Sequence, residues 1–217
     1  MSEKVSLKAA VYLLVYAAFV FMGKLHTLLP FRTPNEIRFA AYALLFAAGA
    51  VLFRETLVQS ALLLRSRPIR QFLLLIGFYI AYLLLSIVVY TLFEPLAGSG
   101  TNDDNVFAAM AAFSPWITLP VLGVMGPIVE EFVYRYLLIG RLSERVPVWA
   151  CVSGSSLLFG LLHIHSLPDL ANIVPYLATG LVLGTLYIVS GQNLLLPIIF
   201  HVFNNLNGLI PSLLYGS

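Results

Sequence analysis

Residues 126–135 read Gly-Pro-Ile-Val-Glu-Glu-Phe-Val-Tyr-Arg and lie within an apolar run that starts near Trp116. Glu130, Glu131 and Arg135 therefore stand inside a segment that otherwise resembles a membrane-spanning helix. On insertion scales each such side chain costs about 2.5–3.5 kcal/mol at the centre of a spanning helix, so three unpaired charges are strongly unfavourable. Charged residues that persist in a span usually serve a function, so this segment is the best indication of function in the sequence.

The composition predicts an integral membrane protein. Of the 217 residues, 60% are hydrophobic and 10% are charged, and the mean hydropathy is +0.93; a soluble domain carries roughly 25% charged residues. We therefore expect a single transmembrane domain over residues 1–217, in contact with membrane lipids. The net charge of +2, without a basic cluster interleaved with aromatics, argues against nucleic-acid binding. The lone Cys151 excludes a disulfide framework.

Apolar runs separated by polar stretches predict an all-α bundle of about seven transmembrane helices. The predicted helices cover residues 7–23, 37–58, 71–93, 115–140, 148–166, 170–189 and 193–214. Lys4 and Lys8 precede the first helix, but no small-x-small cleavage site occurs before Lys24, so we interpret it as a retained helix and not as a signal peptide.

The distribution of Lys and Arg predicts the orientation. Arginines flank the connections at 59–70 and 141–147, whereas the 94–105 connection holds acidic residues and neither Lys nor Arg. Cytoplasmic loops are enriched in Lys and Arg. The connections at 59–70 and 141–147 and the N-terminus are therefore predicted to be cytoplasmic, and the 94–105 connection and the C-terminus external. Lys24, Arg32 and Arg38 do not fit this scheme.

Two later spans also carry polar side chains. The run at 148–166 contains Phe159-Gly-Leu-Leu-His163, and the last run contains His201-Val-Phe-Asn-Asn205. Residues four apart share a helix face, so His201 and Asn205 are expected to point the same way. Counting the helical rise from the flanking loops places both histidines in the inner-to-middle part of a core about 30 Å thick.

The same rule lets Glu131 pair with Arg135, which lowers the cost of keeping both in the membrane. Glu130 is rotated about 100° from Glu131 and remains free. Counting from Arg141 puts Glu130 at a depth similar to that of the histidines. We therefore predict an intramembrane polar cavity in which these groups meet.

This set of residues suits hydrolysis. Glu130 is a candidate general base for water, His163 a candidate to hold that water or shuttle its proton, and His201 with Asn205 a candidate pair of oxyanion donors. Glu130, His163 and His201 are also ligands that zinc accepts, with an open position for water. With Glu131 committed to Arg135, no second carboxylate is free to orient a histidine. We therefore favour glutamate-activated water, with zinc as the alternative.

Glu-Glu-x-x-x-Arg, Phe-x-x-x-His and His-x-x-x-Asn occur in this order on successive apolar helices. Together they resemble the CAAX-protease and bacteriocin-processing (Abi) family, which includes the type II prenyl-protein endopeptidase, over about residues 115–210. The resemblance implies that Glu130 is the catalytic base, His163 positions water, and His201 and Asn205 form the oxyanion pair. Three residues are supporting in this scheme: Glu131, Arg135 and Phe159.

The sequence thus predicts an intramembrane endopeptidase, a multi-pass protein of a prokaryotic cell membrane. Its substrate is expected to be a prenylated CAAX protein or a small peptide precursor. Two alternatives stay open. Buried Glu, His and Arg also mark the relays of proton-coupled transporters, and a non-enzymatic immunity or scaffold protein would share the same fold.

Overall fold

The computed structural model describes residues 3–25, 34–93, 101–164 and 170–215. Every element within these ranges is a helix, which confirms the all-α prediction for them. Eight elements are α-helices of twelve residues or more: α1 (Glu3–Leu25), α2 (Pro34–Leu52), α3 (Arg54–Ser66), α4 (Pro68–Phe93), α5 (Thr101–Ala112), α8 (Val148–His163), α9 (Ile173–Val189) and α10 (Leu195–Tyr215).

One long helical segment, Pro115–Glu144, carries the two glutamates, and we call it the central helix. It consists of α6 (Pro115–Thr118), η2 (Leu119–Met125), α7 (Gly126–Glu131), η3 (Phe132–Arg141) and η4 (Leu142–Glu144). The short η5 (Leu170–Asn172) leads into α9. Proline starts α2, α4 and α6, where its missing N–H would have no partner within the helix.

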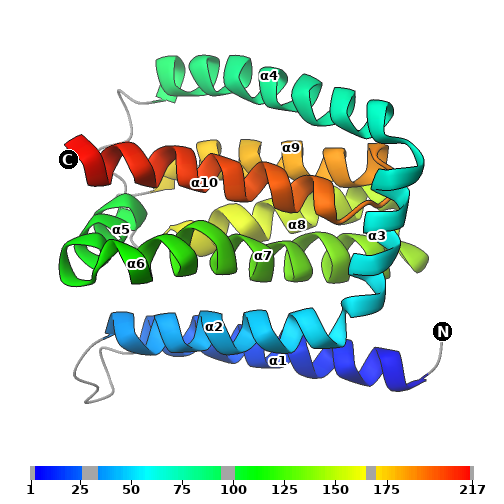
Figure 1. Cartoon of the computed structure of the whole chain (residues 1–217), viewed down its shortest axis with the longest axis horizontal. Coiled ribbons are helices and arrows are strands. Elements are labelled where there is room, and N and C mark those ends of the chain that lie inside the picture. The colour runs from blue at the N-terminus through cyan, green and yellow to red at the C-terminus, as the bar shows by residue number, and fades with distance from the viewer. Residues whose placement is uncertain (1–2, 26–33, 94–100, 165–169, 216–217) are drawn as a thin grey trace.

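The helices other than α3 and α5 run roughly along one direction (Figure 1). The central helix contacts α2 on one side and α8, α9 and α10 on the others. Helix α4 packs on α9 and α10 at the outer side of the bundle, opposite the α1–α2 pair. Helix α3 crosses the end of the bundle where the central helix finishes (Figure 1).

Fewer helices qualify as membrane spans than the sequence predicted. Three described helical segments are long and apolar enough to cross a membrane: 68–93, 115–144 and 170–189. A fourth qualifies if α2 and α3 count as one bent span. The count of seven therefore stays a prediction, and so does the polar cavity.

The predicted helix at 37–58 is wrong, because the chain breaks at Phe53 and the following helix is bent by 71°. The Phe53 side chain is buried against the rings of Tyr12, Phe132 and Tyr136. Helix α3, with two arginines, a glutamate and a glutamine, is too polar to continue through an apolar bundle. It crosses the bundle end instead.

The structure adds a helix, α5 (Thr101–Ala112), where the sequence suggested only a connection. Its first residues, Thr-Asn-Asp-Asp, are of the kinds that favour helix N-termini, and its second half is rich in alanine. Of the acidic residues in the predicted external connection, Glu94 lies outside the described residues.

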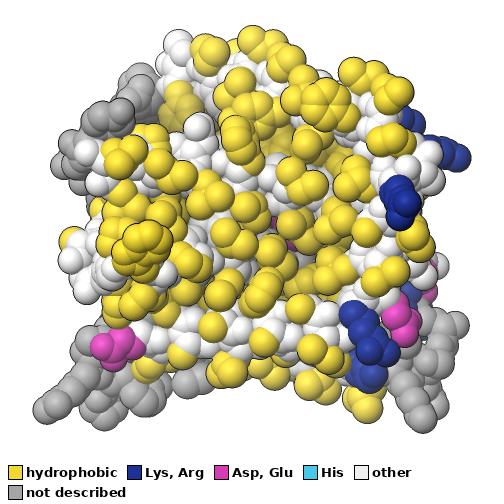
Figure 2. All heavy atoms as spheres, viewed as in Figure 1, with side chains coloured by type: hydrophobic (Ala, Val, Ile, Leu, Met, Phe, Trp, Pro, Cys, Tyr) yellow, Lys and Arg dark blue, Asp and Glu magenta, His cyan; other side chains and the backbone are white. Residues whose placement is uncertain are grey.

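Basic side chains gather at one end of the molecule, beside α3, while the rest of the visible face is mostly hydrophobic (Figure 2). The two arginine-rich connections therefore lie at the same end, as predicted, and a cavity between α3 and η4 joins them. The first turn of α1 lies at that end too (Figure 1). Which side of a membrane this end faces stays a prediction, and Arg32, one of the misfits, lies outside the described residues.

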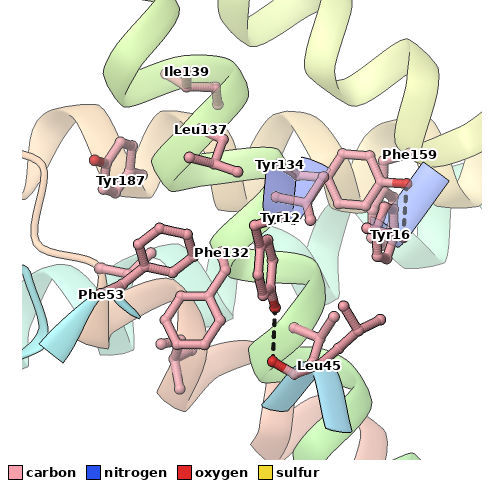
Figure 3. Packing of buried hydrophobic residues seen from close by; sticks show 14 of the residues in the cluster. Tyr12, Tyr16, Leu45, Phe53, Phe132, Tyr134, Leu137, Ile139, Phe159 and Tyr187 are labelled. Atoms are coloured by element: carbon pink, nitrogen blue, oxygen red, sulfur yellow. Dashed lines mark hydrogen bonds between the residues drawn. The ribbon is translucent and has the colours of Figure 1, made fainter. Parts of the chain in front are cut away.

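Aromatic side chains fasten the α1–α2 pair to the central helix (Figure 3). Phe132 is fully buried between Tyr12 and Phe53. Gly49 of α2 allows this close approach, because a Cβ there would lie 2.6 Å from the Phe132 ring. The Tyr12 hydroxyl donates to the Leu45 carbonyl at 3.0 Å. This packing fixes α2 beside Glu130.

Candidate active site

The central helix winds more widely than an α-helix on both sides of its glutamates. Segments η2 and η3 are π-helical, and the short α-helical stretch that ends in Glu130 and Glu131 lies between them. Pro120 and Pro127 lack the N–H that an ordinary helical turn would use, which favours departure from regular α-helical hydrogen bonding. Such wide turns are rare and often occur at functional sites.

Glu131 is fully buried and binds two partners. Its Oε2 lies 3.1 Å from Nε of Arg135, so the predicted ion pair is confirmed. Its Oε1 lies 2.8 Å from Nδ1 of His201 on α10. The prediction that Arg135 would leave Glu131 no capacity to orient a histidine is therefore wrong, because a carboxylate has two oxygens and the structure uses both.

The contact with Glu131 determines the tautomer of His201. A carboxylate paired with a guanidinium accepts hydrogen bonds, so Nδ1 of His201 carries a proton and donates it. The Nε2 atom then points elsewhere, and it lies 3.8 Å from Oε2 of Glu130. A buried carboxylate also orients the histidine in hydrolases that have a catalytic Ser-His-Asp triad.

Glu130 is only 13% exposed and makes different contacts with its two oxygens. One faces His201, as described above. The other, Oε1, accepts a hydrogen bond of 3.3 Å from the hydroxyl of Tyr42 on α2. Both carboxylates thus face the His201 ring, but the other partner of Glu131 is a guanidinium, whereas that of Glu130 is a hydroxyl.

His163 lies at the end of α8 and is joined to the cluster through Phe159. Its Nδ1 lies 2.7 Å from the Phe159 carbonyl, which can only accept, so Nδ1 is the protonated nitrogen and Nε2 is unprotonated in the neutral ring. The ring stacks on Tyr176 at 4.3 Å. The Phe159 ring contacts the rings of both His163 and His201, at 4.5 and 5.8 Å. Phe159 is therefore in contact with both histidines.

Arg135 is buried under aromatic faces. Its guanidinium carbon lies 5.0 Å from the centre of the Phe159 ring and 5.8 Å from that of Tyr134. Among the described residues, no hydrogen-bond acceptor reaches Nη1 or Nη2. Ring faces attract cations, most of all in desolvated surroundings. The faces of the Tyr134 and Phe159 rings therefore take the place of further hydrogen-bond acceptors around the Arg135 guanidinium.

Asn205 shares a helix face with His201, as predicted, since both contact the central helix. Its side-chain N–H donates to the Leu122 carbonyl at 3.2 Å. A backbone carbonyl in the wide-turned η2 is thereby paired with a side chain from another helix. One N–H of Asn205 is used in this way, and the role of Asn205 as an oxyanion donor stays a prediction.

The residues that the sequence put forward for zinc do not form a metal centre. Within the described ranges, no three His, Cys, Asp or Glu side chains lie close enough together to hold an ion. Glu130 and His201 approach each other, but His163 is not grouped with them at ligand distances. The zinc alternative therefore does not fit this arrangement, and we derive no step through a metal.

A cavity of about 530 Å³ lies away from Glu130, at the end of the bundle that α3 crosses. It contains none of the four residues predicted to be catalytic. The lining is mainly polar and includes Gln59, Tyr136, Arg141, Glu144 and Gln192. We place the candidate site at the glutamates because His201 and Arg135 contact them there. In the cavity at the bundle end, the charges of Arg141 and Glu144 are paired with each other.

The sequence analysis did not predict that tyrosines lie around the site. Tyr42 reaches Glu130 from a helix that carries no motif, and Tyr16 of α1 shares a hydrogen bond of 3.2 Å with Tyr134. Tyrosines are common in apolar helices, so nothing in the sequence distinguishes Tyr42 from a packing residue. Its contact with Glu130 becomes evident only from the packing of α2 on the central helix.

Fold and site define a helical membrane protein with a buried Glu–His–Arg cluster. Residues 112–207 match the family described as type II CAAX prenyl endopeptidase Rce1-like. This range includes all seven residues that the motifs put forward, so the resemblance is confirmed for this part of the chain.

A relative from Bacillus subtilis (strain 168), described as "Putative membrane peptidase YdiL", is 28% identical over 109 residues. The alignment covers 50% of this chain and 43% of that protein. The chain thus matches less than half of the length of this relative. No solved structure gives a significant match.

Proposed function

We propose that this protein is an intramembrane endopeptidase in which Glu130 activates a water molecule. The observation that carries the proposal is the line of contacts from Arg135 through Glu131 and His201 to Glu130, all within the region that matches the endopeptidase family. The match supports a membrane protease at the level of the family. The catalytic roles are our inference from the geometry.

The charges of the cluster suggest its resting state. Two carboxylates and one guanidinium leave one negative charge in an environment where unbalanced charge is costly. The proposed mechanism places one added proton on His201, whose Nδ1 lies 2.8 Å from Oε1 of Glu131, so that both ring nitrogens carry a proton. In that state Glu130 is an ionised base, and Nε2–H of His201 is a hydrogen-bond donor directed toward it.

The reaction then follows from these positions. Glu130 removes a proton from water, and the water oxygen bonds to the carbonyl carbon of the substrate peptide. Nε2–H of His201, with the second Asn205 N–H, stabilises the negative oxygen. Glu130 returns its proton to the amide nitrogen, the C–N bond breaks, and a carboxylic acid and an amine leave. His163, whose neutral ring presents Nε2 as an acceptor, orients the water.

The substrate we propose is a peptide segment at the membrane, either in a prenylated CAAX protein or in a small peptide precursor. The family match supports the first, and the apolar bundle suits a lipid-bearing peptide. A panel of internally quenched peptides, each made with and without a C-terminal farnesyl group, distinguishes the two.

The test uses purified full-length protein in nanodiscs, with wild type and Glu130→Gln compared on the panel. Wild type is expected to cleave at one bond, identified by mass spectrometry. The Glu130→Gln variant is expected to lose a factor of about 100 to 10,000 in kcat, the typical contribution of a general base. Cleavage by Glu130→Gln at the wild-type rate refutes the proposal. Stoichiometric zinc in active protein, with activity lost on chelation and restored by the metal, would refute the metal-free step.

A further inference from the structure

Tyr42 contacts the proposed base from outside the region that matches the family. It lies on α2, whereas the match begins at residue 112. Its hydroxyl donates to Oε1 of Glu130 at 3.3 Å, and the direction of donation is fixed because an ionised carboxylate only accepts. The N-terminal helices therefore reach the same side chain that the motifs identify.

Packing limits the movement of the Tyr42 ring. The ring meets Phe19 of α1 edge-on, with 5.6 Å between centroids and 77° between planes. The ring also packs against the buried cluster formed by Phe39, Ala109 and Val121, and a Cβ added at Gly126 of the central helix would lie 3.8 Å from it. These contacts limit how far the ring can move while its hydroxyl is bonded to Glu130.

The two oxygens of Glu130 are then no longer equivalent. A carboxylate rotates easily about its last side-chain bond, and a rotating carboxylate aligns poorly with a bound water. A hydroxyl on Oε1 holds the plane of the group and leaves Oε2 directed at Nε2 of His201, 3.8 Å away. The oxygen that takes the proton is therefore the one that faces His201.

We propose that Tyr42 is a positioning residue for Glu130, so that α2 completes the catalytic site. This inference rests on the proposed function. It implies that the matched region alone, residues 112–207, lacks a part of its own active site. The substrate does not need to touch Tyr42 for the effect, so the effect is expected on turnover and not on substrate affinity.

The chain offers a matched control in Tyr12. Its hydroxyl is buried in the same α1–α2 pair and donates to the carbonyl of Leu45, three residues after Tyr42 (Figure 3). Tyr12→Phe and Tyr42→Phe each remove one oxygen and keep the ring. Only the second removes a hydrogen bond to Glu130.

The experiment measures kcat and KM on the best-cleaved peptide of the panel, together with the thermal unfolding midpoint, for wild type and both variants in full-length protein. Tyr42→Phe is expected to lower kcat about 10-fold, the loss of one hydrogen bond to a charged group, with KM within about twofold of wild type. Tyr12→Phe is expected to keep the wild-type kcat, and both variants to unfold at similar temperatures. Equal kcat values in the two variants, or a change in KM alone, overturn the inference.

A second measurement does not depend on turnover. The infrared difference spectrum between wild type and Tyr42→Phe is expected to show a shifted carboxylate stretching band, and the same difference recorded in a Glu130→Gln background is expected to lack it. A band that persists in that background refutes the contact. Cleavage by Glu130→Gln would refute the proposed function, whereas an inactive Glu130→Gln with a fully active Tyr42→Phe refutes only the role of Tyr42.

Discussion

Helix α4 and the central helix are both long enough to cross a membrane, yet they are opposites in composition and placement. In the most apolar window of α4, 6% of the residues are buried inside the protein, compared with 50% for the central helix. The body of α4 carries no charge, whereas the central helix carries Glu130, Glu131 and Arg135. The more apolar helix is thus the one on the outside (Figure 1).

This contrast is the reverse of the pattern in soluble proteins. Lipid is as apolar as leucine, so an apolar face gains little from burial against another helix. A charge gains a great deal, because its partners are available only inside the bundle. Hydrophobicity in this sequence therefore indicates which segments lie in the membrane, and the polar exceptions indicate which of them lie inside the bundle.

The largest expected effect tests the buried ion pair. Glu131→Gln removes one charge and leaves Arg135, already without other acceptors among the described residues, unpaired. Breaking a buried pair in this way typically costs about 3–5 kcal/mol, so we expect a loss of that size in the free energy of unfolding, measured by SDS titration in mixed micelles.

The control for this prediction is Leu84→Ala on α4. Leu84 is 61% exposed, so its truncation opens no internal cavity, and we expect a change within about 0.5 kcal/mol. Equal losses in the two variants would contradict the contrast between the helices.

The second prediction compares a glycine on each helix. A Cβ at Gly140 of the central helix would lie 2.5 Å from the hydroxyl of Tyr187, whose ring is buried and has little room to move. A Cβ at Gly77 of α4 meets nothing within 4 Å. Gly140→Ala is expected to destabilise by about 1–3 kcal/mol through overpacking. Gly77→Ala is expected to be neutral or to stabilise by up to about 1 kcal/mol, since alanine favours helix.

The same SDS titration measures both glycine variants. A Gly140→Ala variant as stable as wild type would show that the Tyr187 side chain can move aside without loss of free energy of unfolding. The interior of the bundle would then be less tightly packed than the structure indicates.

The smallest expected effect compares two hydroxyls. Ser155 of α8 donates to the Tyr134 carbonyl of the central helix at 2.7 Å, whereas Thr91 of α4 donates to the Ile87 carbonyl within its own helix, also at 2.7 Å. Bonds between helices in membranes contribute about 0.6 kcal/mol on average. We expect a loss of about that size for Ser155→Ala and none for Thr91→Ala, whose hydroxyl slightly weakens its own helix. A greater loss for Thr91→Ala would reverse the comparison.

The contacts that the sequence predicted are the local ones. The pairing of Glu131 with Arg135 follows from their spacing in one helix, and the shared face of His201 and Asn205 follows in the same way. The bond between Glu131 and His201 joins residues 70 positions apart and depends on how α10 packs on the central helix. No spacing rule gives that distance, so the second use of Glu131 could not be predicted.

Two features of the fold escaped prediction for similar reasons. The break at Phe53 is stabilised by aromatic rings from α1 and the central helix, which a hydropathy pattern does not record. The contact of Tyr42 with Glu130 depends in turn on where that break leaves α2. The motifs put forward the candidate site residues, whereas the tertiary packing determines which side chains contact them.

The neighbouring carboxylates provide the most direct test of the central claim, which is that chemistry depends on Glu130 and structure on Glu131. The measurement is kcat/KM together with the unfolding midpoint for Glu130→Gln and Glu131→Gln under one set of conditions. We predict that Glu130→Gln unfolds near the wild-type temperature and cleaves about 100 to 10,000 times more slowly than wild type, and that Glu131→Gln unfolds at a lower temperature. A folded Glu130→Gln variant that cleaves as fast as wild type would contradict the account.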